Sequence, residues 1–260
     1  MFYKVDKNIV DEEVFDFYYN QIKKEIEDEL KILKKQIGLK NVKRFKENVT
    51  NEINKEQEMG LMYTFGNAKL PKTTMIINLG SWFNCSGRKE GFCEICEKCY
   101  DKQPEVRFPK RFAGRFRQEI FWRTADAHII ARIIINILNK NKQINLIRWS
   151  EVGELRNQDD LNKLIRISNI IGSLTGVKSY IYTHNRFLDF TDNKERPYLI
   201  INGSGFMVDN EYRVVEKDKI EEEFNNLSDL SNKKECICDC ETCTHYCSEN
   251  GNWIIIEELR

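Results

Sequence analysis

The nine cysteines of this chain fall into two groups that are separated by a long stretch without any cysteine. The first group has the spacing C-x2-C-x2-C with one further cysteine before it; its members are Cys85, Cys93, Cys96 and Cys99. The second group follows Cys236 near the C-terminus; its members are Cys238, Cys240, Cys243 and Cys247. Cysteines this close together in sequence can surround one small inorganic centre. We therefore read the rest of the chain as a scaffold that positions two groups of thiolates.

Metal ligands explain these cysteines better than disulfides do. The N-terminal residues M-F-Y-K-V-D-K-N lack the apolar segment of a signal peptide, and no apolar run reaches the roughly 18 residues of a membrane span. We therefore expect a cytoplasmic protein that does not enter a membrane. In such a reducing compartment, clustered cysteines are metal ligands more often than disulfides.

The spacing of the first group favours an iron–sulfur cluster over zinc. Structural zinc sites usually combine two C-x2-C pairs across a loop, whereas here three or four ligands crowd one short loop. We expect the first group to hold a [4Fe–4S] cluster. The C-terminal group either holds a second centre or completes the first, so one cluster or two remain open, and zinc is the alternative metal. His245 is a further potential ligand.

Hydrophobic periodicity predicts an N-terminal helical extension over residues 1–70, followed by an α/β domain over residues 71–260. The extension contains a long amphipathic helix at 9–37 and a second helix from Val42 to Ile53. Apolar runs predict four strands, at 74–79, 145–149, 177–183 and 198–201, and a closing strand at 253–256. Helices are expected at 119–139, 161–171 and 220–227. Short strands that alternate with helices indicate an open or partial (β/α) barrel.

Polar residues directly after the predicted strands form a candidate ligand pocket. In a barrel the carboxyl ends of the strands converge on one face, here the face of the first cysteine loop. Two carboxylates, a guanidinium and an imidazole beside a metal centre could bind an anionic or amino-acid-like ligand. The catalytic candidates are Arg148, Glu151, Glu154 and His184, and the binding candidates are Thr183, Arg186, Asn202 and Ser204. Ordinary loop polarity is the competing interpretation.

The stretch from Arg107 to Arg123 interleaves basic and aromatic residues. Such a pattern can follow a nucleic-acid backbone while the rings stack on bases. However, the four-residue spacing of Phe108, Phe112 and Phe116 favours core packing on a helix. The formal net charge of the chain is zero, so any attraction to nucleic acid must come from a local patch. Nucleic-acid binding is therefore the minority interpretation.

Several motifs together resemble a known family. N-C-S-G, C-E-K-C-Y, R-W-S-E-V-G-E-L, Y-I-Y-T-H-N-R and the C-terminal C-x-C-x2-C-x3-C are similar to motifs of the phage-encoded "gene product eighty-eight" proteins. The resemblance covers roughly residues 73 to 260. It implies a compact partial barrel similar to the radical-SAM core, and an iron–sulfur protein of phage origin that acts in the cytoplasm of a bacterial host.

Two functional classes follow. The first is an iron–sulfur protein that is either an enzyme acting on a small-molecule ligand at the cluster or a redox protein served by an electron donor. The second is a zinc-stabilised, non-enzymatic module that binds nucleic acid or a host protein. Anaerobic colour and iron content separate the two.

Overall fold

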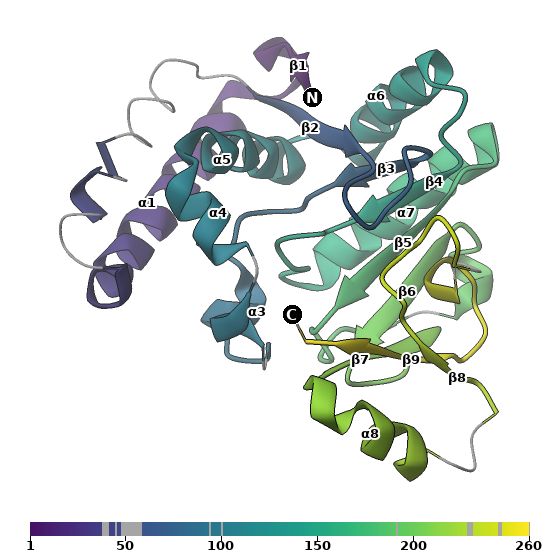
Figure 1. Cartoon of the computed structure of the whole chain (residues 1–260). Helices are drawn as coiled ribbons and strands as arrows, with labels where there is room; N and C mark the ends of the chain where they lie inside the picture. The colour runs from purple at the N-terminus through teal and green to yellow at the C-terminus, as the bar shows by residue number, and fades with distance from the viewer. Residues whose placement is uncertain are drawn as a thin grey trace. The chain divides into compact units, whose positions relative to one another are not determined.

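In the computed structural model the chain divides into two units. Figure 1 colours the chain by residue number from the N-terminus to the C-terminus. The described residues are 1–37, 42–44, 46–47, 59–93, 95–99, 101–190, 192–227, 231–243 and 246–259. The first unit comprises Met1–Tyr63, Ile77–Asp126 and Val152–Arg156, and the second comprises Thr64–Ile76, Ala127–Glu151 and Asn157–Arg260. The helix predicted at 42–53 lies largely outside the described residues, as does His245. A domain boundary near residue 70 stays a prediction.

The strands form one open, nine-stranded sheet in the order β1-β2-β3-β4-β5-β6-β7-β9-β8. Strand β1 runs antiparallel to β2, whereas β4 to β9 run parallel to their neighbours. The bounds are β1 Phe2–Val5, β2 Met59–Phe65, β3 Thr74–Ile77, β4 Leu146–Trp149, β5 Lys178–Thr183, β6 Leu199–Ser204, β7 Asn210–Val215, β8 Lys233–Glu235 and β9 Ile254–Glu258.

The α/β class and the four predicted strands, which are β3 to β6, are confirmed. The closing strand is corrected. The segment predicted at 253–256 is β9, which pairs with both β7 and β8 inside the sheet, so β8 is the edge and the sheet does not close. The short, charged sequence K-K-E of β8 suits an edge position, because charged side chains discourage further strand pairing.

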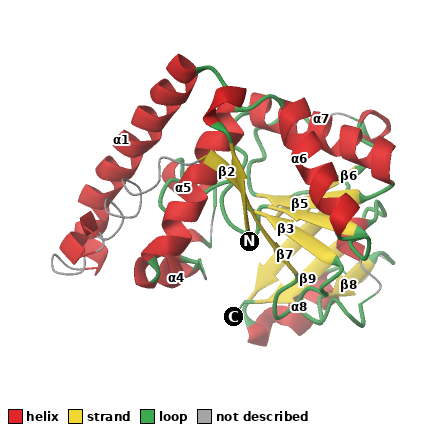
Figure 2. Cartoon of the chain, turned by 90° about the horizontal axis from the view of Figure 1, so that it is seen from above, coloured by secondary structure: helices red, strands yellow, loops and turns green. Residues whose placement is uncertain are grey.

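In the second unit, both faces of the central strands are covered. Helices α6 (Ala127–Lys140) and α7 (Gln158–Thr175) pack against each other, and α7 packs on β5 and β6 (Figure 2). Helix α7 starts where the Asn157 side chain accepts the Asp160 N–H at 3.0 Å, and it ends at Gly176, whose φ of 73° suits glycine. Ser179 contacts Ser168 of α7. Since side chains alternate along a strand, Tyr180 and Tyr182 face away from α7.

The first unit is built on two long helices, α1 (Glu12–Ile37) and α5 (Pro109–Thr124), which pack together. Helix α1 buries an apolar stripe that includes Phe15, Ile22 and Ile26. Two short helices, α3 (Ser86–Lys89) and α4 (Lys102–Arg107), join the cysteine loop to α5.

The single helix predicted at 119–139 is instead two helices, the end of α5 and the whole of α6. Asp126 stands at the N-cap position of α6, where an aspartate favours a helix start. In α5, Phe112, Phe116 and Phe121 are buried while Phe108 is exposed, which confirms core packing for this stretch apart from Phe108.

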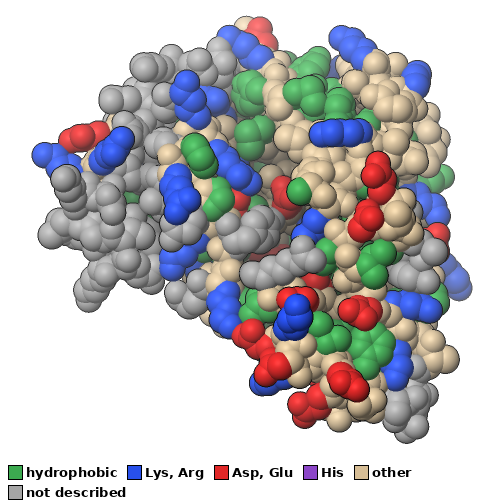
Figure 3. Space-filling model, viewed as in Figure 1, with side chains coloured by type: hydrophobic (Ala, Val, Ile, Leu, Met, Phe, Trp, Pro, Cys, Tyr) green, Lys and Arg blue, Asp and Glu red, His purple; other side chains and the backbone are tan. Residues whose placement is uncertain are grey.

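The remaining elements are short. They are η1 (Lys7–Ile9), η2 (Cys96–Lys98), η3 (Asn193–Glu195), η4 (Lys217–Lys219), η5 (Tyr246–Ser248) and α8 (Ile220–Asn226), which confirms the predicted helix near 220–227. Among the helices that the structure describes, none combines the length and the apolar character needed to cross a membrane. On the face drawn in Figure 3, basic and acidic side chains are interspersed, in keeping with a net charge of zero.

Candidate metal centres

The first cysteine loop follows β3 along the chain and is held by short helical turns. Cys85 occupies the N-cap position of α3, where the nearby backbone N–H groups of Gly87 and Arg88 favour its thiolate without forming a capping hydrogen bond. A side chain at Gly87 would place its Cβ 3.2 Å from Cys93 Cβ and 3.7 Å from Cys85 Sγ. Glycine therefore lets these two cysteines approach.

All four thiols of this loop lie within electrostatic reach of one another. A hydrogen bond to Cys93, burial and the nearby thiolates of Cys93, Cys85 and Cys99 raise the pKa of Cys96 far above its usual value. Burial, with a smaller effect of Glu154, raises the pKa of Cys85 to about 12. Burial, Cys93 and Glu105 raise the pKa of Cys99 to about 11. Without a metal these thiols therefore stay protonated; a metal ion or cluster would displace the protons, and four clustered thiols fit such a centre.

A buried ion-pair network links the segments on either side of the first cysteine loop to helix α5. Arg115, with only 1% of its side chain exposed, contacts both Asp101 and Glu105, and the more exposed Arg111 contacts Asp101 at 2.8 Å. Glu105 also accepts the Ser81 hydroxyl at 3.1 Å. Burial raises the pKa of Glu105 to about 8 although that hydroxyl, Arg111 and the N–H groups of two further loop residues lower it. The network ties the segments before and after the cysteines to α5.

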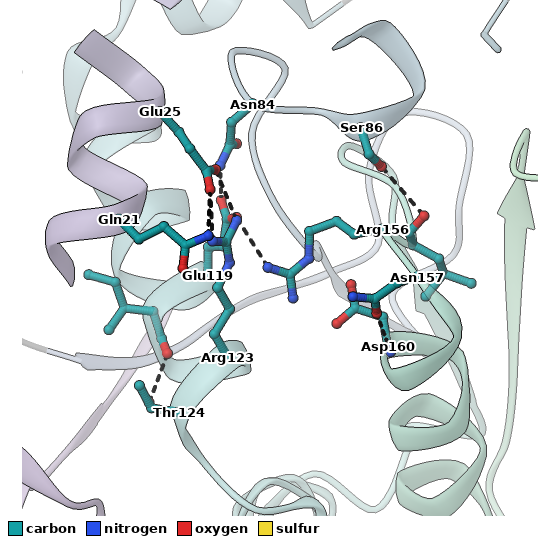
Figure 4. Close-up of polar contacts among 12 residues, drawn as sticks. Gln21, Glu25, Asn84, Ser86, Glu119, Arg123, Thr124, Arg156, Asn157 and Asp160 are labelled. Carbon is teal, nitrogen blue, oxygen red and sulfur yellow. Dashed lines mark hydrogen bonds and ion pairs between the residues drawn. The ribbon is translucent and has the colours of Figure 1, made fainter. Parts of the chain in front are cut away.

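A second polar cluster lies beside Cys85, and Figure 4 shows it. Glu119 accepts the Asn84 amide at 2.6 Å and pairs with Arg123, while Arg156 Nη1 lies 4.0 Å from Glu119 Oε1. Arg123 also contacts Glu25 at 3.1 Å. Burial raises the pKa of Glu25, but the hydrogen bond and charge of Arg123 outweigh it and hold that pKa below its usual value. The cluster joins α1, α5, the cysteine loop and the segment Val152–Arg156.

The backbone of the segment Val152–Arg156 packs closely against the chain at Gly80. Gly153 has a φ of 89°, and a Cβ there would lie 2.6 Å from the Gly80 nitrogen, so glycine is required. Ser86 Oγ lies 3.4 Å from the Leu155 carbonyl. Sequence reasoning missed Glu119 and Arg156 as site residues. The spacing of four residues between Glu119 and Arg123 was the available signal, because such pairs share a helix face.

In the second unit, the C-terminal cysteines lie over the face of the sheet that points away from α7. Tyr182 donates to Cys247 Sγ, and Asn202 donates to the Cys247 carbonyl at 2.9 Å. Asn210 donates to Asn202 at 3.0 Å and to the Glu249 carbonyl at 2.8 Å. The polar side chains on this face of the strands therefore fix the end of the cysteine segment.

The thiols of the C-terminal cysteine group lie close to one another. Burial and, to a smaller extent, neighbouring cysteines raise the pKa of Cys236 to about 12 and those of Cys240 and Cys247 to about 11. Arg148 lowers the pKa of Cys240 and of Cys247, so its guanidinium lies near them; it also stacks over Tyr182 at 5.2 Å. The second group thus has its own set of ligands within its own unit.

Comparison with known protein families shows which family this chain belongs to. The chain matches the model of the family described as Gene product 88 over residues 32–243. The chain belongs to this family. No curated protein and no solved structure matches it. The two cysteine centres of this Gene product 88 protein are therefore interpreted from their own chemistry.

The predicted pocket residues of this Gene product 88 protein lie at several places. Arg148 and Asn202 contact the C-terminal cysteine segment, as described above. Glu151 accepts the Asn67 amide at 2.6 Å. Glu154 accepts the Leu155 N–H at 2.8 Å and lies near Cys85.

The other pocket candidates lie at the ends of two strands of the second unit. Thr183 is buried and accepts the Asn185 N–H at 3.0 Å. The His184 carbonyl accepts the Arg186 N–H at 2.9 Å, and Ser204 ends β6 opposite Tyr212. A single pocket formed by all eight candidates stays a prediction.

Proposed function

We propose that this protein is a phage-type iron–sulfur protein with a closed [4Fe–4S] cluster held by Cys85, Cys93, Cys96 and Cys99. The observation that carries the proposal is the gathering of these four thiols on one loop of the first unit, a donor set that suits an iron–sulfur cluster. A fourth cysteine ligand closes the cluster, which favours electron transfer over substrate binding at an open iron.

When bound, such a cluster supplies one-electron chemistry at a potential that its surroundings set. This chain's own residues supply those surroundings. The N–H groups of Gly87 and Arg88 lie near Cys85 Sγ, and N–H groups directed at cluster sulfurs are one of the factors that set the potential. The Asp101–Glu105–Arg115 network keeps the loop fixed, so little reorganisation should accompany a change of charge.

An enzymatic role is the second candidate, and the Glu119 cluster favours it. Arg156 is partly exposed, with 26% of its side chain accessible, and its guanidinium lies beside the buried Glu119. A guanidinium with a carboxylate nearby suits a small anionic or amino-acid-like ligand, whose carboxylate Arg156 would bind. Glu154, near Cys85, is the further acid or base of this candidate site. Arg156→Gln should abolish ligand binding and leave the cluster spectrum unchanged.

The finer fold assignment, a partial barrel similar to the radical-SAM core, is also part of the proposal. It is supported by a cysteine loop that follows a strand of a largely parallel, open sheet. Four protein ligands, however, leave no iron free for S-adenosylmethionine. We therefore expect the reduced protein not to cleave S-adenosylmethionine; formation of 5′-deoxyadenosine would contradict the closed cluster.

The experiment that tests the main proposal is anaerobic purification. The protein is expected to be brown, with absorbance near about 400 nm and about four iron and four sulfide ions for each cluster. A colourless protein that contains stoichiometric zinc would instead support the alternative, a zinc-stabilised module that binds nucleic acid or a host protein.

A further inference from the structure

We propose that Glu257 is a metal ligand and that it binds, together with Cys236 and Cys238, one divalent ion such as zinc at the edge of the sheet. This inference concerns the C-terminal cysteine group described above and does not depend on the proposed N-terminal cluster. The sequence pattern assigned this centre to cysteines only, and it left Cys236 outside the ligand set.

The distances among the three side chains suit one ion. The ligand atoms of Cys236, Cys238 and Glu257 all lie within 4.8 Å of one another. The two sulfurs are 3.9 Å apart, and two thiolates on a tetrahedral zinc with bonds of about 2.3 Å stand about 3.8 Å apart. Cys238 Sγ lies 2.9 Å from Glu257 Oε1, a thiol–carboxylate hydrogen bond. A metal ion would replace its proton and widen this separation to about 3.6 Å.

The sheet register explains why these residues meet. Glu235 of β8 pairs with Ile256 of β9, and the Cys236 N–H donates to the Ile256 carbonyl at 2.7 Å. One step further along the same register, Cys236 stands opposite Glu257. In a parallel pair, residues that stand opposite each other project from the same face of the sheet. Strand pairing therefore places the first thiol and the carboxylate side by side.

The backbone of Cys238 provides a separate indication. Cys238 has a φ of 55°, in the left-handed region that residues with a side chain rarely adopt. Such a conformation is unfavourable for residues with a side chain, and it persists where the surroundings impose it, often at ligand sites. Here it turns the chain after β8 so that the second sulfur returns to Glu257. The Cys240 N–H then donates to the Lys69 carbonyl at 3.0 Å, which holds the turn.

We expect Cys240, which follows Cys238 in the same turn, to move in as the fourth ligand, since its sulfur lies outside the group of atoms within 4.8 Å of one another. Its thiol lies within electrostatic reach of Cys236, Cys238 and Cys243. Three thiolates and a carboxylate give a net charge of −2 around a divalent ion, and the Lys69 ammonium, which contacts Glu257, offsets part of it. The competing explanation is that Glu257 serves only as the ion-pair partner of Lys69.

The test uses the anaerobically purified full chain, loaded with zinc alone, with iron measured separately. Zinc affinity is measured by competition with a chromophoric chelator, and the ligands are counted by X-ray absorption at the zinc edge. We expect one zinc per chain with three sulfur ligands and one oxygen ligand. Glu257→Gln should weaken zinc binding at least tenfold, while Glu258→Gln, on the opposite face of the same strand, should not change it.

Two further variants keep the test decisive. Cys236→Ala should lower the sulfur count by one even if Glu257→Gln folds poorly. Lys69→Met should leave zinc bound, because the lysine only offsets charge. The proposal is overturned by four sulfur ligands in the wild-type chain, by equal zinc affinity of Glu257→Gln and Glu258→Gln, or by a chain that binds no zinc. Absence of iron at the N-terminal loop would overturn the proposed function and leave this site intact.

Discussion

The two cysteine groups gather their thiols by different means. In the first unit, Cys85 and its three partners lie on one short loop, and a buried Asp101–Glu105–Arg115 network fixes that loop from below. In the second unit, the cysteines lie over a sheet face, where Asn202 and Tyr182 bind the segment and strand pairing sets the spacing. The first site therefore depends on buried charge, and the second depends on sheet register.

This difference has a chemical consequence. The ligands of the first group are all thiols, which suits a cluster built on iron and sulfide. The second group adds a carboxylate from β9, which suits a single divalent ion. Clustered cysteines in one chain thus need not serve one kind of centre, and the element that carries each ligand indicates which kind it is.

The largest expected effect separates the two centres. Cys96→Ser should abolish the absorbance near about 400 nm and remove the bound iron, because Cys96 is the most buried thiol of the first group. It should leave one zinc per chain. Cys243→Ser is the matched control, since we place Cys243 outside both ligand sets. Iron and zinc analysis of the two variants checks this; loss of zinc in Cys96→Ser would show that the groups form one site.

Breaking the buried network should be the next largest effect. Arg115→Leu leaves the buried Asp101 carboxylate and the Glu105 carboxyl group without their shared cation, so the free energy of unfolding should fall by about 3–5 kcal/mol. Arg111→Leu removes a more exposed partner of the same Asp101 and should cost less than about 1 kcal/mol. Urea denaturation of both variants measures the difference. Equal losses would show that the loop does not depend on buried charge.

The network also predicts a pH dependence. The pKa of Glu105 is raised to about 8, so between its ordinary value of 4.5 and pH 8 the folded chain binds a proton that the unfolded chain releases. Stability from this group is therefore full below about pH 4.5 and falls as pH rises toward 8, by roughly 5 kcal/mol. Glu105→Gln should flatten that part of the profile. Urea denaturation at several pH values tests it, and an unchanged slope in the variant would contradict the cause.

The smallest expected effect lies at the second site. Tyr182→Phe removes one hydrogen bond to Cys247 Sγ and keeps the ring that packs on Tyr212, with ring centres 4.6 Å apart. The free energy of unfolding should fall by about 1 kcal/mol, and the zinc content should not change. Tyr180→Phe serves as the control on the same strand face. A large loss in Tyr182→Phe would mean that the cysteine segment depends on this bond more than on sheet register.

Sequence patterns predicted the core of the sheet well. Strands β3 to β6 each contain a run of apolar or β-branched residues, most of them buried, so these runs stand out although Arg148 lies in β4 and polar residues occur in β5 and β6. Strands β1, β2, β7 and β8 were missed. Strands β1, β7 and β8 are half-exposed and carry charged or polar side chains, which weakens the apolar signal, whereas β2 is largely buried but lies within residues 1–70, which were predicted as a helical extension. The break between α5 and α6 was missed because it contains neither proline nor glycine.

The candidate site was less predictable, for a physical reason. Close spacing showed that the cysteines of each group gather, because neighbours in sequence must be neighbours in space. Glu257 is opposite Cys236 only through pairing of β8 with β9, and Glu119 reaches Asn84 only through helix packing. The sequence predicted that Arg115 is exposed to solvent, but its side chain is buried in ion pairs. Such partners depend on tertiary contacts, which spacing along the chain does not encode.

One measurement tests the central claim most directly: electron paramagnetic resonance of the anaerobic, dithionite-reduced full chain, with iron, acid-labile sulfide and zinc counted in the same sample. We expect the signal of a single reduced [4Fe–4S] cluster, about four iron and four sulfide ions per chain, and one zinc ion. The Cys96→Ser variant should lose the signal and keep the zinc. A chain without sulfide, whose thiolates hold only zinc, would contradict the account.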